Sequence, residues 1–281
     1  MSNKFKNILV PVDFSINTEI AINKAIKYSD EGTTIHLLNV QMDLFLGLSA
    51  RTYRYVIENS VQGNHDVVSE QLQQWKWTIK ESAMVNVCTW LVYDSSVATA
   101  IERKAINLRA DLIIIGKNSH HSWFPFLNTV IPSEVAERTR IPVLTVKPGS
   151  FRNEVQKIIV PVTTEMRDQK LKLIDSLCDK FKAQVHLVTF MDDGTPSDLH
   201  VSALLETYQQ LKMNPACSVE YSVLHGKNKA KELLHYAGKI DADMLLVHPQ
   251  SETKIGWLNS HISDVLPADS KIQVLAIQPT I

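Results

Sequence analysis

The sequence contains one strand pattern twice, and this internal repeat constrains the fold more than any other feature. NILVPVD occupies residues 7–13, and KIIVPVT occupies residues 157–163. The next apolar segment repeats at the same offset of 150 residues, because IHLL begins at residue 35 and VHLV at residue 185. Self-similarity at a fixed period predicts two tandem copies of one structural unit.

Later segments of the two copies match at a shorter offset. ADLIII begins at residue 110 and ADMLLV at residue 242, which is an offset of 132 residues. The difference between the two offsets gives copy one about eighteen extra residues between its second and fourth strands. We place the two domains at residues 1–148 and 154–281, with the boundary near the Lys-Pro-Gly-Ser sequence at residues 147–150, whose composition is typical of a linker.

In each copy, short apolar strands alternate with segments of helical period. In copy one we expect strands at residues 8–12, 34–40, 87–93, 112–115 and 143–146, and helices at residues 17–29, 66–81, 97–108 and 132–138. This alternation predicts an α/β fold, in which each domain is a doubly wound parallel sheet with helices on both faces. Pro11 and Pro161 come near the end of their strands, where the ladder can stop.

Composition and charge exclude several classes of partner. The net charge is −1 and the computed pI is about 6.8, so there is no bulk attraction to nucleic acid or to anionic lipid. No apolar run approaches the roughly 20 residues of a membrane span. Cys88, Cys178 and Cys217 show no paired spacing. The cysteines predict free, mostly buried thiols in a reducing compartment, and we expect a cytoplasmic location.

Three residues follow strands that end at one edge of the predicted sheet in copy one. They are Asp13, Val40 and Gly116. Ligands of open α/β sheets bind beyond the carboxyl ends of the strands. A carboxylate there can accept hydrogen bonds from a ribose or a base, and a glycine lets the backbone approach a phosphate. Equally, Asp13 fits a turn or a helix entry, and Gly116 fits a turn after a strand. The residues alone leave both interpretations open.

Four segments of copy one, each with a counterpart in copy two, resemble the universal stress protein family. They are the strand of residues 7–13, HLLNV at 36–40, ADLIIIG at 110–116 and RIPVLTVKP at 140–148. The resemblance implies two five-stranded domains of the adenine-nucleotide α-hydrolase-like fold, packed as a pseudo-dimer. Residues 142–146 and 273–277 would pair with each other, which hides two apolar strand edges. The resemblance also implies a stress response protein that works by binding, without turnover, and that forms a homodimer of the tandem chain.

The resemblance also supplies a nucleotide site in copy one. ATP-binding members carry an Asp after the first strand and G-x2-G-x9-G-[S/T] after the fourth. Carried over without gaps, these positions are Asp13, Gly116, Ser119, Thr129 and Val130, and Val40 would offer its backbone to the base. Ser119 and Thr129 provide hydroxyls but lack the backbone freedom of glycine. We therefore expect at most weak ATP binding in copy one.

Copy two departs further from the family pattern. Thr163 replaces the Asp, His248 replaces the first glycine, and Pro249 has no N–H to donate. We expect no nucleotide in copy two. The alternative function is a nucleotide-independent interaction scaffold or a binder of another small ligand. An ATP-hydrolysing enzyme is less favoured, because the sequence has no P-loop, no G-x-S-x-G elbow and no metal-ligand spacing.

Aromatic and histidine residues have structural interpretations. His36 and His186 recur at matching strand positions, which favours a repeated structural role over catalysis. Trp75, Trp77 and Trp90 are expected to pack against the core, not to form a stacking surface for nucleic acid.

Overall fold

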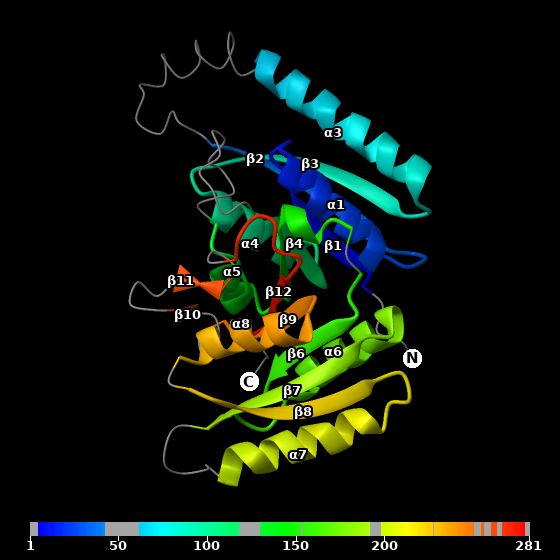
Figure 1. Cartoon of the computed structure of the whole chain (residues 1–281). Helices are drawn as coiled ribbons and strands as arrows, with labels where there is room; N and C mark the ends of the chain where they lie inside the picture. The colour runs from blue at the N-terminus through cyan, green and yellow to red at the C-terminus, as the bar shows by residue number, and fades with distance from the viewer. Residues whose placement is uncertain are drawn as a thin grey trace.

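The two halves of the protein share one continuous sheet. A computed structural model of the chain describes residues 5–42, 62–117, 130–152, 154–191, 198–226, 228–249, 254–255, 260–262 and 266–278. Ten strands form the sheet in the order β3-β2-β1-β4-β5-β12-β9-β6-β7-β8 (Figure 1). Neighbouring strands are parallel within each half, and β5 and β12 are antiparallel where the halves meet. The predicted α/β fold is confirmed.

Copy one has the predicted sequence of elements. Its strands are β1 Asn7–Pro11, β2 Thr34–Met42, β3 Asn86–Asp94, β4 Leu112–Gly116 and β5 Val143–Val146, and its helices are α1 Ile16–Tyr28, α3 Gln62–Ser82, α4 Val97–Asn107 and α5 Pro132–Thr139. Within this half the order is β3-β2-β1-β4-β5. The order therefore reverses between β1 and β4, which is the topological switch point where open α/β sheets bind ligands.

Copy two repeats this topology as β12-β9-β6-β7-β8. Its elements are β6 Lys157–Pro161, α6 Asp168–Phe181, β7 Gln184–Met191, α7 Asp198–Lys212, β8 Ser218–His225, α8 Lys229–Ile240, β9 Met244–Val247 and β12 Gln273–Ala276, with a small hairpin of β10 Lys254–Ile255 and β11 Ser260–His261. A 3-10 turn at Pro148–Ser150 lies between the halves. The domain limits at 1–148 and 154–281 stay a prediction.

The sheet is buried on both faces, as a parallel sheet requires. Helices α1, α3, α6 and α7 cover one face and α4, α5 and α8 the other. Along β1, Ile8 and Val10 pack under the first set, and Leu9 packs under the second. β1 and β6 end at their prolines, as predicted. Their near-continuous apolar sequence follows from this double burial.

A repeated aspartate explains part of the sequence similarity between the copies. The Oδ2 atom of Asp111 accepts hydrogen bonds from the backbone N–H groups of residues 6 and 7, at 2.8 and 2.9 Å. In copy two, Asp243 Oδ2 accepts from the N–H groups of residues 156 and 157, both at 3.0 Å. Each aspartate ties the start of one central strand to the start of its neighbour. The Ala-Asp of both copies therefore has a structural role.

The final strands of the two copies pair with each other, as predicted. Val274 lies opposite Thr145, and Leu275 lies opposite Leu144. The edges of β5 and β12 are therefore not available to another chain. This pairing makes the sheet continuous across the pseudo-dimer.

Helices α1 and α6 pack against each other beside this strand pair. The Lys180 Nζ atom donates to the Ser29 carbonyl at 2.7 Å and forms an ion pair with Asp30 Oδ1 at 2.8 Å. The rings of Tyr28 and Phe181 meet edge to face, with centroids 4.9 Å apart. A lysine of copy two therefore binds the carbonyl end of a helix in copy one, where positive charge is favourable.

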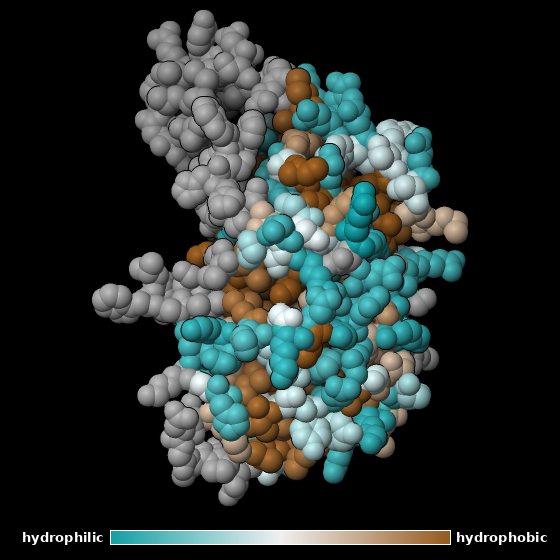
Figure 2. All heavy atoms as spheres, in the orientation of Figure 1, coloured by the Kyte–Doolittle hydropathy of each residue, from teal (hydrophilic) through white to brown (hydrophobic). Residues whose placement is uncertain are grey.

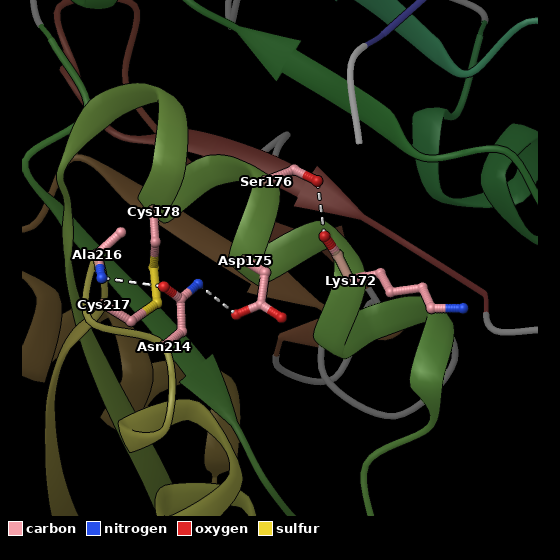
Figure 3. Close-up of a disulfide and its surroundings, with 7 residues drawn as sticks. All are labelled: Lys172, Asp175, Ser176, Cys178, Asn214, Ala216 and Cys217. Carbon is pink, nitrogen blue, oxygen red and sulfur yellow. Dashed lines mark hydrogen bonds between the residues drawn. A yellow bond between two sulfur atoms is a disulfide. The ribbon is translucent and has the colours of Figure 1, made fainter. Parts of the chain in front are cut away.

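The prediction of three free thiols was wrong. Cys178 in α6 and Cys217, one residue before β8, form a disulfide with a Cα–Cα distance of 5.2 Å (Figure 3). Only Cys88 is free. The two partners are separated by 39 residues, so no local spacing could indicate the pair. The thiol argument for a reducing compartment therefore no longer holds.

The tryptophans divide between core and surface. Trp75 packs against the core as predicted, but the prediction for Trp77 was wrong because its exposed fraction is 66%. The two residues are two positions apart on α3 and so lie on nearly opposite sides of the helix. In the view of Figure 2, hydrophilic residues cover much of the described surface, with smaller hydrophobic groups between them. No helix among the described residues is long and apolar enough to cross a membrane.

The two repeated histidines have the predicted structural role. The Trp90 indole donates to His36 Nδ1 at 3.2 Å, and Tyr236 Oη lies 3.4 Å from His186 Nδ1. Because an indole N–H only donates, His36 Nδ1 is the acceptor and the proton is on Nε2, which faces Asn7 Oδ1 at 3.2 Å. Burial is the largest cause that lowers the pKa of both imidazoles. Each histidine therefore joins its strand to an aromatic residue.

Candidate functional site

Three of the five predicted site residues lie at or near the carboxyl ends of adjacent strands. Asp13 follows β1, Gly116 ends β4 and Val40 lies in β2, and the strand order is β2-β1-β4. We call this edge the copy-one rim. It coincides with the switch point of the sheet. Ser119 and Thr129 lie outside the described residues.

Asp13 organises the turn that leads into α1. Its Oδ1 atom accepts hydrogen bonds from the Ser15 backbone N–H at 3.0 Å, from Ser15 Oγ at 2.6 Å and from Thr18 Oγ1 at 2.6 Å. The Asp13 N–H in turn donates to Thr18 Oγ1 at 3.0 Å. These bonds use Oδ1 alone among the carboxylate oxygens. The helix-entry interpretation therefore has direct geometric support, and a ligand would have to use the other oxygen or compete.

Phe14, which sequence reasoning missed, fixes the same turn. Its φ of 60° places a non-glycine residue in the left-handed region. Such a conformation costs on the order of 1–3 kcal/mol and persists only where the surroundings impose it. The Phe14 ring meets Trp75 of α3 edge to face, with centroids 6.2 Å apart. No sequence pattern marks a positive φ at a phenylalanine.

Val40 is buried inside β2 and does not end it. The predicted strand was two residues short, because β2 pairs with β3 as far as Met42 opposite Asp94. Toward β1, the last residue pair is Pro11 with Leu38. Val40 therefore lies past the end of the β1 ladder, where its edge of β2 faces the rim.

Gly116 is required by close packing. A Cβ atom placed on Gly116 would lie 2.0 Å from the backbone oxygen of Asn17, in the first turn of α1. Real Cβ contacts do not occur at this distance, so any side chain would displace the helix. Neither a phosphate nor a simple turn is needed to explain this glycine. Its role depends on a contact between elements a hundred residues apart, which no local pattern shows.

In copy two, the same position carries a side chain and the helix begins later. His248 corresponds to Gly116, and Arg167 corresponds to Asn17. Arg167 has an extended backbone, and α6 begins only at Asp168, two residues later in the repeat than α1. The turn that contacts Gly116 in copy one is therefore not helical in copy two.

The rim of copy two is bulkier than that of copy one. Phe190 occupies the position of Val40 and is buried. Burial is the largest cause that lowers the pKa of His248, and Lys170 lowers it further. Lys170 is itself buried and donates to the carbonyl of Pro161, the last residue of β6, at 3.3 Å. Among the described residues, no group of three or more His, Cys, Asp and Glu could hold a metal ion.

Comparisons with known structures give the fold of the whole chain. A universal stress protein from Archaeoglobus fulgidus superposes with a TM-score of 0.64 at 17% identity, covering 98% of this chain and 97% of that one. A functionally unknown protein from Pseudomonas aeruginosa gives 0.53 at 17% identity, over 98% and 93% of the two chains. The cytoplasmic domain of a prokaryotic cation chloride cotransporter gives 0.54 at 14%, over 97% and 95%.

Sequence comparison gives the family. No curated protein sequence matches the chain significantly. A model of the universal stress protein family matches residues 4–147, which is just over half of the chain and includes every described element of copy one. The second half repeats the same strand order in the same sheet. The chain belongs to the universal stress protein family, and its two halves are tandem copies of that fold.

Proposed function

We propose that the protein acts in the stress response as a non-catalytic binding protein, with at most weak adenine nucleotide (ATP) binding at the copy-one rim. The observation that carries the proposal is the position of Asp13, Val40 and Gly116 on three adjacent strands at the switch point. A ribose or base would contact Asp13, and the β2 edge at Val40 would face the base. Phosphates would approach the strand end at Gly116, near the N-terminus of α1.

The geometry of the same residues supports weak binding. Asp13 Oδ1 already accepts three hydrogen bonds, so a nucleotide gains only what Oδ2 can offer without disrupting the α1 entry. Gly116 is packed against Asn17, so the packing of α1 already requires the absence of a side chain at this position. A site whose polar groups are engaged elsewhere gains little net free energy from a ligand.

Copy two itself is proposed to bind no nucleotide. Thr163 lacks the carboxylate, His248 lacks the small size of glycine, and Phe190 is bulkier than Val40. In this proposal, the second copy is retained because β12 covers the edge of β5.

Calorimetric titration with ATP tests the site with a matched pair of variants. Asp13→Asn keeps an oxygen that can accept at the α1 entry and removes the charge, while Thr163→Ala changes the equivalent position of copy two. We expect one weak site per chain in the native protein and in Thr163→Ala. Loss of a charged acceptor costs about 1.5–3 kcal/mol, so Asp13→Asn should weaken binding by roughly tenfold or more. Two sites per chain, or equal binding by both variants, would contradict the proposal.

Asp13 already accepts hydrogen bonds within the protein, and Gly116 is already packed against α1. These contacts also favour a second candidate, a nucleotide-independent scaffold or a binder of another small ligand. Saturable heat with ATP separates the first candidate from this one. Incubation with ATP followed by chromatography tests the non-catalytic part, because accumulation of ADP that scales with protein and is absent in Asp13→Asn would indicate an enzyme.

A homodimer and a cytoplasmic location belong to the proposal. Because β5 and β12 already pair within one chain, a homodimer of the tandem chain must use another surface. Sedimentation of the purified chain measures its mass in solution and decides this point.

A further inference from the structure

A cavity lies between the copies, away from the copy-one rim. Its volume is about 210 Å³, and it is lined by Lys24, Lys27 and Tyr28 of α1, Glu154 and Val155 ahead of β6, Phe181 of α6 and Gln273 of β12. Gln273 is the first residue of β12, and Glu154 and Val155 precede β6, so the cavity is at the amino ends of these strands. The rim is at the carboxyl ends of the copy-one strands. We call this space the inter-copy cavity.

Two buried side chains of the cavity have unpaired polar atoms. Tyr28 is 1% exposed and Gln273 is fully buried. Neither the Tyr28 hydroxyl nor either polar atom of the Gln273 amide has a hydrogen-bond partner among the described residues. Buried polar groups are nearly always paired in native proteins, so three unpaired atoms around one cavity require an explanation. A ligand that offers hydrogen-bonding oxygens would provide one.

The backbone places these groups on one side of the sheet. Side chains alternate along a strand, and Leu275 belongs to the core cluster that contains the apolar residues of α1. Gln273, two residues earlier, therefore faces α1. Lys24 and Tyr28 are four residues apart and so lie on the same face of that helix. Lys24, Tyr28 and Gln273 therefore line one small space, and each of them carries a hydrogen-bond donor.

The electrostatics of the cavity favour a negative guest. Lys24 is 1% exposed. Burial, and then Lys27, lower its pKa to about 8, while Asp243 and Glu154 act in the opposite direction. Lys24 therefore still carries its charge at pH 7 in a largely desolvated position. Lys27 adds a second positive charge to the lining, against the single carboxylate of Glu154.

We propose that the inter-copy cavity binds a small oxyanion, either a carboxylate or a phosphate, which accepts hydrogen bonds from Tyr28, Gln273 and Lys24. Three donors of this kind match an anion with two or more oxygens and do not match a cation. The remaining Gln273 oxygen can accept from a hydroxyl of the guest. Because α1 belongs to copy one and Gln273 to copy two, the anion would join the copies. This site is independent of the nucleotide proposed for the rim.

Thermal unfolding in the presence of three sodium salts tests the site. Phosphate and acetate are compared with chloride at equal ionic strength, on the native chain, Tyr28→Phe and Gln273→Leu. Tyr208→Phe is the matched control, because the Tyr208 hydroxyl contacts Lys212 on the exposed side of α7, outside the cavity. Tyr28→Phe removes one oxygen and keeps the ring against Phe181, so it tests the site even where Gln273→Leu fails to fold.

We expect a saturable rise in Tm with one of the two oxyanions in the native chain and in Tyr208→Phe. The anion concentration for half the rise should increase about tenfold or more in Tyr28→Phe. Phosphate also stabilises proteins by exclusion from their surface, but that effect does not saturate and is the same in all variants. An oxyanion response equal to that of chloride, or one unchanged in Tyr28→Phe, would overturn the proposal. The acetate and phosphate arms decide which class of anion binds.

Acetate binding should weaken as the pH rises through 8. Acetate keeps its charge throughout this range, so a change between pH 7 and pH 9.5 reports on the protein. Lys24 loses its proton above its pKa of about 8 and then no longer attracts the anion. The charged groups that face it are Lys27 on its own helix, Glu154 ahead of β6 and Asp243 ahead of β9. The Lys24→Met variant should bind acetate weakly at both pH values. If its acetate binding still weakened between pH 7 and pH 9.5 as it does in the native chain, the role of Lys24 would be overturned.

Discussion

Removal of the disulfide by a double substitution, Cys178→Ala with Cys217→Ala, should lower the free energy of unfolding by about 4 kcal/mol. The loop-closure relation gives this value for the 39-residue separation of the two cysteines, since the crosslink restricts the unfolded chain. Alanine is the better replacement because both positions are buried and a serine hydroxyl there would need a partner.

The disulfide connects a helix to the outermost strand region of copy two. It joins α6 to the segment ahead of β8, the outermost strand of that half. The same junction contains the Asn214 side chain, which donates to Asp175 Oδ1 and accepts from the Ala216 N–H, both at 2.9 Å (Figure 3). α6 also carries Lys180, which contacts copy one. Loss of the crosslink should therefore weaken β8 and, through α6, the contact between copies.

Chemical denaturation with and without a thiol reductant measures this effect. The native chain should lose stability on reduction, while the double variant should be unaffected. Cys88→Ala is the control, because Cys88 is the free cysteine and its removal leaves the crosslink intact. That variant should respond to the reductant as the native chain does. Equal stability of the native chain with and without reductant would show that the crosslink does not hold the fold.

The sequence predicted the strands of copy one well because their physical signal is local. A strand buried on both faces must be a short, nearly continuous apolar run, and the segments at Ile8 and Leu112 have this form. The internal repeat then predicted the strands of the second copy, and the family resemblance predicted that the apolar final strands would pair with each other. The strand end at Val40 was misplaced because pairing with β3 continues through the polar Gln41 to Met42.

Features that depend on distant contacts were not predictable. The Cys178–Cys217 bond, the Phe14 turn and the exposure of Trp77 are each decided by which helix packs on which strand. Asp13 shows the same limit at the site. Its place at the rim follows from the strand, but its use by Ser15 and Thr18 follows from the path of the chain into α1.

Gly116→Ala should lower the free energy of unfolding by about 3 kcal/mol, the upper part of the range for overpacked positions. The new Cβ would meet the backbone oxygen of Asn17 at 2.0 Å and its carbonyl carbon at 2.5 Å. Backbone atoms cannot rotate away as a side chain can, so the first turn of α1 must move. Gly238→Ala is the matched control. It lies within α8 with nothing within 4 Å of a new Cβ, and it should gain up to about 1 kcal/mol from helix propensity.

Copy two indicates how the protein would respond to Gly116→Ala. There, His248 takes the glycine position and the helix begins two residues later. The same retreat of α1 would begin the helix at Thr18 and separate its hydroxyl from Asp13. The Gly116→Ala variant should therefore show both a lower helical content and altered ATP binding. Gly238→Ala should show neither a loss of helix nor a change in ATP binding. Equal stability of the two variants would show that Asn17 and Gly116 are not in close contact, and a ligand or a turn would then have to explain the glycine.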